Sequence, residues 1–259
     1  MLLSGLRCGL QNTPHNHRLA AHRRHAIVRS HDFRGHTDAE RRSRADGGAR
    51  RTGPGKRSGL VREVIIADGG SHDATADIAD AAGAKFIRAE QGRGSQLAAG
   101  AEQARSDWLL FLHADTVLQP GWDSEASAFM ERVDGGARPL AAAAFSFALD
   151  DFGAKPRILE AIVGLRCALL RFPYGDQGLL IPKRLYLAVG GYRPLAVMED
   201  VDLVRRLGRK RLVMMRTKAV TSAERYKREG YIARIARNAA CLTLYYLRVP
   251  PATIVRLYG

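Results

Sequence analysis

The pattern of hydrophobic and polar positions divides the chain of 259 residues into two unlike parts. Up to about Gly59, arginine, histidine, glycine and alanine dominate, and no apolar periodicity is sustained. A stretch of this composition cannot bury enough apolar surface to offset the entropy that is lost on ordering. We therefore expect residues 1–60 to be a disordered basic segment and residues 61–259 to form the folded domain.

From Val61 onwards, short apolar runs alternate with segments of helical periodicity. The apolar runs are closed by turn-forming residues and predict strands at Glu63–Ala67, Lys85–Ile87, Trp108–Leu112 and Ala141–Leu149. The periodic segments predict helices at Thr75–Ala82, Arg93–Ala104, Trp122–Val133, Pro156–Arg171 and Tyr231–Leu247. Strands that alternate with helices at this spacing are typical of parallel βαβ units, so we expect an α/β fold with a mostly parallel sheet flanked by helices.

The formal net charge of +15 changes this picture less than its size suggests. Residues 1–62 hold 14 Lys and Arg against 4 Asp and Glu, so most of the excess belongs to one end of the chain. An arginine-rich arm of this kind can bind nucleic acid or anionic lipid by counterion release. The segment has a single aromatic residue, Phe33, and hence no platform on which bases could stack. We therefore expect no binding to a specific nucleic acid. The segment's four acidic residues also argue against a transit peptide.

Cysteine usage and hydropathy indicate the compartment. The three cysteines are widely separated and form neither a disulfide framework nor a zinc pattern, which favours the reducing cytoplasm. No apolar run is long enough for a transmembrane helix. The apolar stretches Ile158–Leu170 and Tyr231–Leu247 are read either as packing helices or as peripheral contacts with the inner face of the cell membrane.

Two of the predicted strands end in acidic residues. Asp68 closes the first, and His113-Ala114-Asp115 closes another. Open parallel sheets bind ligands at the carboxyl ends of their strands, and Mg²⁺ or Mn²⁺ prefers carboxylate oxygens. These acids are therefore candidates for holding a divalent cation against a diphosphate, although each alone could also serve as a helix cap.

Three further segments carry candidate chemistry. Arg93, between two glycines at the start of a predicted helix, suits a phosphate, whereas many such triplets are plain turns. Asp176 and Gln177 lie in a loop flanked by glycines. Polar residues in such a loop are more typical of a binding site than of a hydrophobic core. Glu199 and Asp200 open an amphipathic helix, where the helix dipole alone also favours acids.

Taken in order, these motifs resemble family 2 glycosyltransferases with the GT-A fold. The resemblance runs from Glu63 to about Gly259. Val-Ile-Ile-Ala-Asp-Gly-Gly-Ser at 64–71 is similar to the family's nucleoside-binding turn, His113-Ala114-Asp115 stands in place of its Asp-x-Asp metal motif, and Glu199-Asp200 is similar to its catalytic motif. The set is also similar to a bacterial subgroup found beside radical-SAM genes and linked to arsenosugar or carotenoid glycosylation.

The resemblance implies a role for each of these residues. Asp68, Arg93, His113 and Asp115 would bind a nucleotide-sugar donor, and Asp115 would also hold Mg²⁺ or Mn²⁺. Asp200, with Glu199 as its competitor, would be the general base of an inverting transfer of the sugar to a hydroxyl. Asp176 and Gln177 would bind the acceptor, either a small molecule or a lipid-like compound.

The sequence departs from this family before Val64, where an apolar strand and a helix should stand. Read one nucleotide later, permitted codons for residues 32–41 spell Ile-Ser-Val-Val-Ile-Pro-Thr-Leu-Asn-Ala, which is a strand of the expected kind. We therefore expect residues 1–57 to be out-of-frame or upstream translation, and the domain from residue 61 to lack its first strand. An inactive glycosyltransferase fragment is the alternative.

Overall fold

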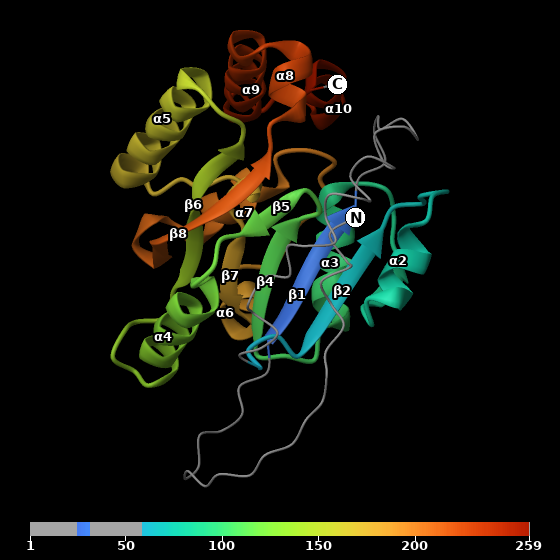
Figure 1. Ribbon diagram of the computed structural model, residues 1–259, viewed down its shortest axis with the longest axis vertical. Helices are drawn as coiled ribbons and strands as arrows, with labels where there is room; N and C mark the ends of the chain where they lie inside the picture. The colour runs from blue at the N-terminus through green and yellow to red at the C-terminus, as the bar shows by residue number, and fades with distance from the viewer. Residues whose placement is uncertain (1–24, 32–58, 259) are drawn as a thin grey trace, which may run out of the picture.

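The structure is a computed structural model that describes residues 25–31 and 59–258, and Figure 1 shows its layered α/β architecture. A single sheet of eight strands has the order β3-β2-β1-β4-β7-β6-β8-β5. The strands are β1 His25–His31, β2 Glu63–Asp68, β3 Lys85–Arg88, β4 Trp108–His113, β5 Thr116–Leu118, β6 Ala142–Asp150, β7 Leu179–Pro182 and β8 Leu212–Ser222.

Helices on both sides of the sheet connect these strands. The described helices are α2 Thr75–Ala81, α3 Arg93–Gln103, α4 Trp122–Asp134, α5 Ala154–Leu170, α6 Lys183–Ala188, α7 Glu199–Leu207, α8 Glu224–Glu229, α9 Tyr231–Tyr246 and α10 Pro251–Tyr258, with short 3₁₀ turns at Gly175–Gln177 and Arg209–Arg211. The predicted helices at α2, α3, α4, α5 and α9 are thus confirmed to within two residues. In the described part of the chain, no helix is both long enough and apolar enough to cross a membrane.

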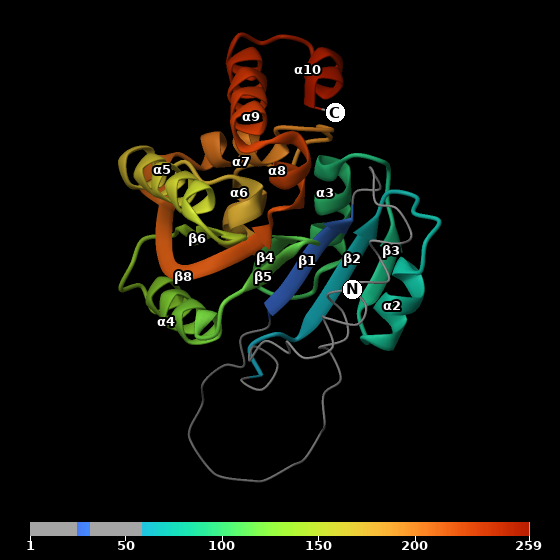
Figure 2. The same cartoon turned by 45° about the horizontal axis from the view of Figure 1, so that its top comes forward.

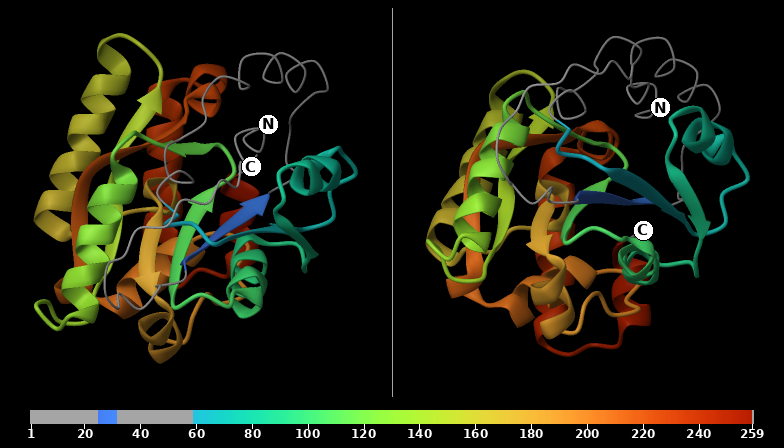
Figure 3. Two further views of the ribbon diagram at one scale, coloured as in Figure 1. Left: turned by 60° about the horizontal axis from the view of Figure 1, so that its bottom comes forward. Right: turned by 90° about the horizontal axis from the view of Figure 1, so that it is seen from below.

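The two faces of β4 contribute to two different cores. Leu109 and Phe111 pack with Leu203 of α7 in one buried cluster, which also includes residues of α3 and α6. Trp108 and Leu110 pack with residues of α4 in the other. This alternation follows from the two-residue repeat of a strand, and it explains why a strand covered on both sides is apolar throughout. Figure 3 shows the helices of the two cores on opposite sides of the sheet.

The prediction that residues 1–60 hold no regular structure is wrong for His25–His31. This segment is β1, and it pairs in parallel with β2 on one side and with β4 on the other. Val28 at its centre is fully buried. A Cβ added to Gly100 of α3 would lie 2.3 Å from Val28 Cγ1, so this helix packs closely against the strand.

The domain therefore does have a strand between β2 and β4, contrary to the prediction that its first strand is missing. Without it, the facing N–H and C=O groups of β2 and β4 would be left unpaired. Pairing of backbone groups places a strand here even though the surrounding sequence is polar. The remaining predictions for residues 1–57 fall on 1–24 and 32–57, which lie outside the described residues.

Register places the predicted strand-end residues at one edge of the sheet. His31 of β1 is opposite Asp68, and Ser30 is opposite His113. Asp68 and His113 thus end the two strands on either side of β1. Two strand spacings separate these strands, which corresponds to about 10 Å. Figures 1 and 2 show α8, α9 and α10 at the end of the molecule toward which β1 and β4 point.

Candidate active site

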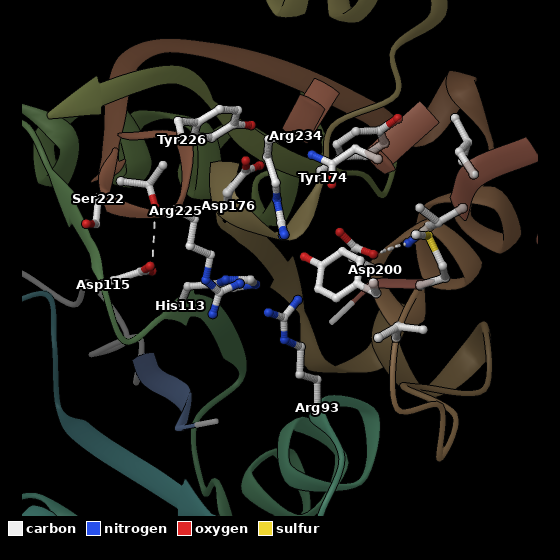
Figure 4. A pocket seen from close by; sticks show the side chains of 17 residues that line it. Arg93, His113, Asp115, Tyr174, Asp176, Asp200, Ser222, Arg225, Tyr226 and Arg234 are labelled. Atoms are coloured by element: carbon white, nitrogen blue, oxygen red, sulfur yellow. Dashed lines mark hydrogen bonds between the residues drawn. The ribbon is translucent and has the colours of Figure 1, made fainter. Parts of the chain in front are cut away.

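A cavity at the carboxyl edge of the sheet brings together most of the predicted site residues (Figure 4). It is lined by side chains from the end of β4, the loop before β7, the start of α7, the end of β8 and the three C-terminal helices. The predicted residues among them are Arg93, His113, Asp115, Asp176 and Asp200. Asp115 and Asp200 therefore line the same cavity.

Asp68 does not line this cavity, contrary to our prediction. It is buried at the end of β2, and its Oδ2 accepts hydrogen bonds from the backbone N–H groups of Gly70 (2.9 Å) and Ser71 (2.8 Å). The Ser71 hydroxyl donates to the other carboxylate oxygen. The carboxylate thus closes its own turn. It does not cap α2, whose N-cap residue is Ala74.

Gln177 is also held by the protein. Its Oε1 accepts hydrogen bonds from the backbone N–H of Tyr174 (3.2 Å) and from Arg166 Nη2 (3.3 Å), and its Nε2 donates to the Phe145 carbonyl (2.9 Å). The side chain is buried and does not line the cavity. The prediction of a direct acceptor contact is thus wrong for Gln177, which instead fixes the loop that carries Asp176.

Asp200 and Glu199 are neighbours in the chain with different surroundings. Asp200 lines the cavity, while Glu199 is buried beneath it and does not. Asp200 Oδ2 accepts a hydrogen bond from the Gly175 backbone N–H (2.5 Å), and its Oδ1 accepts one from Val201 N–H (2.7 Å). Successive helical residues point about 100° apart, which is consistent with the different surroundings of the two acids.

His113 lies close to the Asp200 carboxylate. A Cβ added to Gly175 would lie 2.7 Å from His113 Nε2 and 3.2 Å from Asp200 Oδ2, so only glycine lets this loop lie against both groups. Burial, assisted by the positive charge of Arg93, lowers the pKa of His113 to about 4. The imidazole is therefore neutral at pH 7, and a neutral imidazole can accept a hydrogen bond or coordinate a metal ion.

Asp115 stands just beyond β4, at the wall of the cavity opposite α7. Thr221 Oγ1 of β8 lies 3.5 Å from its Oδ1. Among the described residues, no group of three His, Cys, Asp or Glu side chains could hold a metal ion. Asp115 nevertheless fits a divalent cation, because Mg²⁺ is commonly held by one or two carboxylates together with substrate phosphates and water.

Asp176 lines the cavity with one carboxylate oxygen shielded from solvent. Its Oδ1 is buried and has no hydrogen-bond partner among the described residues. Burial raises the pKa of Asp176 to about 6, and the negative charges of Asp200 and Asp115 add to this effect while Arg166 opposes it. A buried oxygen of this kind is suited to accept a hydrogen bond from a bound ligand.

The sequence interpretation missed two arginines of the cavity. Arg225 of α8 and Arg234 of α9 line it together with Arg93 of α3, and all three are labelled in Figure 4. The buried Arg234 pairs with Glu229 (3.3 Å) and lies over the ring of Tyr258 of α10, 4.7 Å from its centroid. Sequence offered no signal for Arg225 and Arg234, because they belong to charged or amphipathic helices more than 100 residues from β4. Three guanidinium groups in one cavity are suited to bind phosphate groups.

Comparison with solved structures assigns the fold. Over 93% of this chain and 89% of the other, the chain is similar to glucosyl-3-phosphoglycerate synthase from Mycobacterium tuberculosis in complex with Mn²⁺, UDP and glucosyl-3-phosphoglycerate (TM-score 0.55, 17% identity). It is similar to TarS 1–349 of S. aureus in complex with UDP over 91% and 69% (TM-score 0.52, 13% identity). The corresponding values for mannosyl-3-phosphoglycerate synthase from Rubrobacter xylanophilus are 86% and 74% (TM-score 0.52, 15% identity).

These likenesses define the class of fold, which is the α/β GT-A fold of glycosyltransferases, as predicted. Within the chain, residues 56–138 match the sequence model of glycosyl transferase family 2. That segment runs from just before β2 to the end of α4 and includes Arg93, His113 and Asp115. No curated protein matches the chain.

Proposed function

We propose that the protein transfers a sugar, with inversion, from a nucleotide-diphospho-sugar to a hydroxyl acceptor. The observation that carries this proposal is the cavity at the carboxyl edge of a GT-A sheet, where Asp115, His113, Arg93 and Asp200 come together. Two carboxylates with different surroundings can serve different roles. Asp115 would act on the donor side and Asp200 beside the acceptor.

The donor side of the cavity is formed by Asp115, His113 and Arg93. Asp115 would hold Mg²⁺ or Mn²⁺, which would neutralise charge on the diphosphate, and the neutral His113 would contact the donor beside it. Arg93, at the first turn of α3, adds a guanidinium and the positive end of the helix dipole. Arg225 is the second cation available to the phosphates, since it lines the same cavity from α8.

Asp200 is the proposed general base. It accepts the proton of the acceptor hydroxyl, the oxygen attacks the anomeric carbon, and the bond from that carbon to the diphosphate breaks with its electron pair leaving on the nucleoside diphosphate. The hydrogen bonds from Gly175 and Val201 fix the carboxylate for this task. Asp176 would accept a hydrogen bond from another part of the acceptor.

The substrate range is proposed only at the level of class. The sugar is of the hexose type, and the acceptor is a small-molecule or lipid-like compound bearing a hydroxyl group. We place the protein in the bacterial cytoplasm, either free or peripherally bound at the inner face of the cell membrane. The subgroup associated with radical-SAM genes belongs to the same proposal, and the genes on either side of this one test it.

Thermal shift and product release test the donor half of this function. UDP, GDP and their hexose conjugates are offered to the full chain with and without Mn²⁺, and release of nucleoside diphosphate is followed. Asp115→Asn should weaken both Mn²⁺ and donor binding by about tenfold or more, because a neutral amide is a poor ligand for these cations. Asp80→Asn, on the exposed surface of α2, is the matched control and should behave like the wild type. Unchanged donor binding in Asp115→Asn would contradict the proposed metal site.

A further inference from the structure

The outer face of α5 is apolar, where a helix at the surface is expected to be polar. Ile158, Ile162, Leu165 and Leu169 recur every three or four residues and are 55% to 61% exposed. The opposite face of the helix is the one that packs into the protein, through Leu159, Val163 and Cys167. The exposed stripe is therefore an addition to the core-forming face, and more than half of each of its side chains is left open to solvent.

Two more exposed apolar side chains continue this stripe toward α9. Asp151 accepts a hydrogen bond from the Tyr231 hydroxyl (2.5 Å) and pairs with Lys227 Nζ (2.9 Å), which ties the loop before α5 to the start of α9. Phe152 and Ile232, the residues that follow Asp151 and Tyr231, are 95% and 85% exposed. Figures 1 and 2 show α5 and α9 on the side of the molecule away from α2.

The charges around these apolar residues present a positive surface. Four ion pairs are formed by residues of α5, α8, β8 and the loop before α5, and in each of them the basic side chain is 42% to 61% exposed while the acidic one is only 11% to 17% exposed. Their cations thus face outward, and four cations meet three acids because Arg157 and Lys218 share Glu160. The pairs are Arg157–Glu160, Lys218–Glu160, Lys227–Asp151 and Arg228–Glu229.

We propose that this face docks on an anionic phospholipid bilayer. We define the docking surface as Phe152, Ile158, Ile162, Leu165, Leu169 and Ile232. Large apolar residues ringed by outward-facing cations are the combination that interfacial membrane binding requires. A second copy of the chain fits the surface less well, because a two-fold contact would bring the same cations face to face.

The docking surface is continuous with the candidate active site through α9. Ile232 lies in the first turn of this helix, and Arg234, Asn238 and Leu242 further along it line the cavity. Docking would therefore bring α9, which also lines the cavity, to the membrane surface. Membrane binding does not depend on sugar transfer, so the failure of one leaves the other standing.

Flotation with vesicles tests the docking surface. The full chain is mixed with vesicles of phosphatidylcholine containing phosphatidylglycerol, or of phosphatidylcholine alone, and should bind only the former. The double variant Phe152→Ser, Ile232→Ser should bind at least about tenfold more weakly, since two large apolar side chains no longer enter the interface. Leu187→Ser on α6 is the matched control, because Leu187 is 62% exposed but lies outside the docking surface.

The basic excess of residues 1–62 can itself attract anionic vesicles, but all variants share it, so their comparison isolates the docking surface. If the wild type does not bind, or if the double variant binds as tightly as Leu187→Ser, the proposal is overturned. It is also overturned if the wild type is a dimer that the double variant dissociates while neither floats.

Fluorescence provides a second measurement that does not rely on a loss of binding. The two native tryptophans, Trp108 and Trp122, are buried, so a tryptophan introduced at an exposed position reports on its own surroundings. Phe152→Trp should shift to the blue on anionic vesicles and be quenched by brominated acyl chains, whereas Leu187→Trp should not change. An unquenched Phe152→Trp on bound vesicles would assign the contact to another surface.

Discussion

Asp200 is the residue on which the proposed chemistry depends most directly. Its two carboxylate oxygens are held by the backbone N–H groups of Gly175 and Val201 while the side chain remains part of the cavity wall. Glu199 is also an acidic residue, but it is buried and does not line the cavity. The two acids therefore differ in access to a substrate, which sequence cannot distinguish for adjacent residues.

Asp200→Asn should lower the turnover number by about a hundredfold or more and leave donor affinity nearly intact. A general base acts on the acceptor proton in the transition state, so its loss affects turnover rather than donor binding. Sugar transfer and donor binding are measured side by side, with Asp80→Asn as the control. Full activity in Asp200→Asn would refute the assignment, and loss of transfer in Glu199→Gln with an intact fold would favour Glu199 instead.

Asp176 should make the free energy of unfolding of the protein depend on pH. Its pKa of about 6 in the folded protein lies above the ordinary value of 3.8. The folded state therefore binds this proton more tightly than the unfolded state does. The contribution of Asp176 to stability is fully present below about pH 4 and is lost as the pH rises through about 6.

Asp176→Asn should therefore be more stable than the wild type at neutral pH, by up to about 3 kcal/mol. The difference in free energy of unfolding should shrink as the pH is lowered from about 6 to about 4. Urea unfolding at a series of pH values measures it, and Asp80→Asn controls for the loss of one carboxylate. A difference that does not vary with pH would contradict the raised pKa.

At the scale of the element, β1 is the feature that most changes the interpretation of the chain. It lies between β2 and β4, and its pairing aligns the strand ends at which Asp68 and His113 stand. The close approach of Gly100 to Val28 shows that α3, which carries Arg93, rests on this strand. A strand from the basic N-terminal part thus supports the donor side of the cavity.

Val28→Asp should destabilise the domain by about 3 kcal/mol or more, because it buries an unpaired charge among apolar side chains. Val28→Ala should cost less, since it only removes methyl groups. Thermal unfolding measures both, and Leu187→Asp on the exposed face of α6 is the control that should be nearly neutral. If Val28→Asp unfolds at the temperature of the wild type, β1 is not part of the folded domain.

At the scale of the whole molecule, two amino-acid sequences are candidates for the strand between β2 and β4: one from this chain and one from the shifted reading frame. The structure places His25–His31 there. The shifted reading of residues 32–41, Ile-Ser-Val-Val-Ile-Pro-Thr-Leu-Asn-Ala, is more apolar and has stronger strand propensity. We therefore still propose that residues 1–57 are out-of-frame or upstream translation.

We compare the present chain with a variant in which residues 32–57 are replaced by the translation of the shifted reading frame. The variant should unfold at a higher temperature and transfer sugar faster. The reason is that a more apolar strand buries more surface in the same position. The DNA sequence of this region and the thermal unfolding of both chains provide the test. If the chain as given is the more stable one, His25–His31 is the native first strand and the frameshift is rejected.

The class of fold and the chemistry at the strand ends could be predicted from sequence, because both depend on local patterns. An apolar run such as Trp108–Leu112 is covered on both faces in the structure, as its composition requires. Asp115, His113 and Asp200 could be identified because each directly follows or opens such an element. The order of the strands could not be derived in this way, since β6 pairs with β7 and β8 through contacts that span dozens of residues.

Only the tertiary structure decided which polar residues share a cavity. Asp68 and Gln177 look like ligands in the sequence, but their hydrogen-bonding groups are taken up by the protein itself. Arg225 and Arg234 look like ordinary surface cations, but α8 and α9 fold back over the carboxyl edge of the sheet and turn them inward. Local sequence fixes what a side chain can do; the long-range packing of the sheet and the C-terminal helices fixes what it meets.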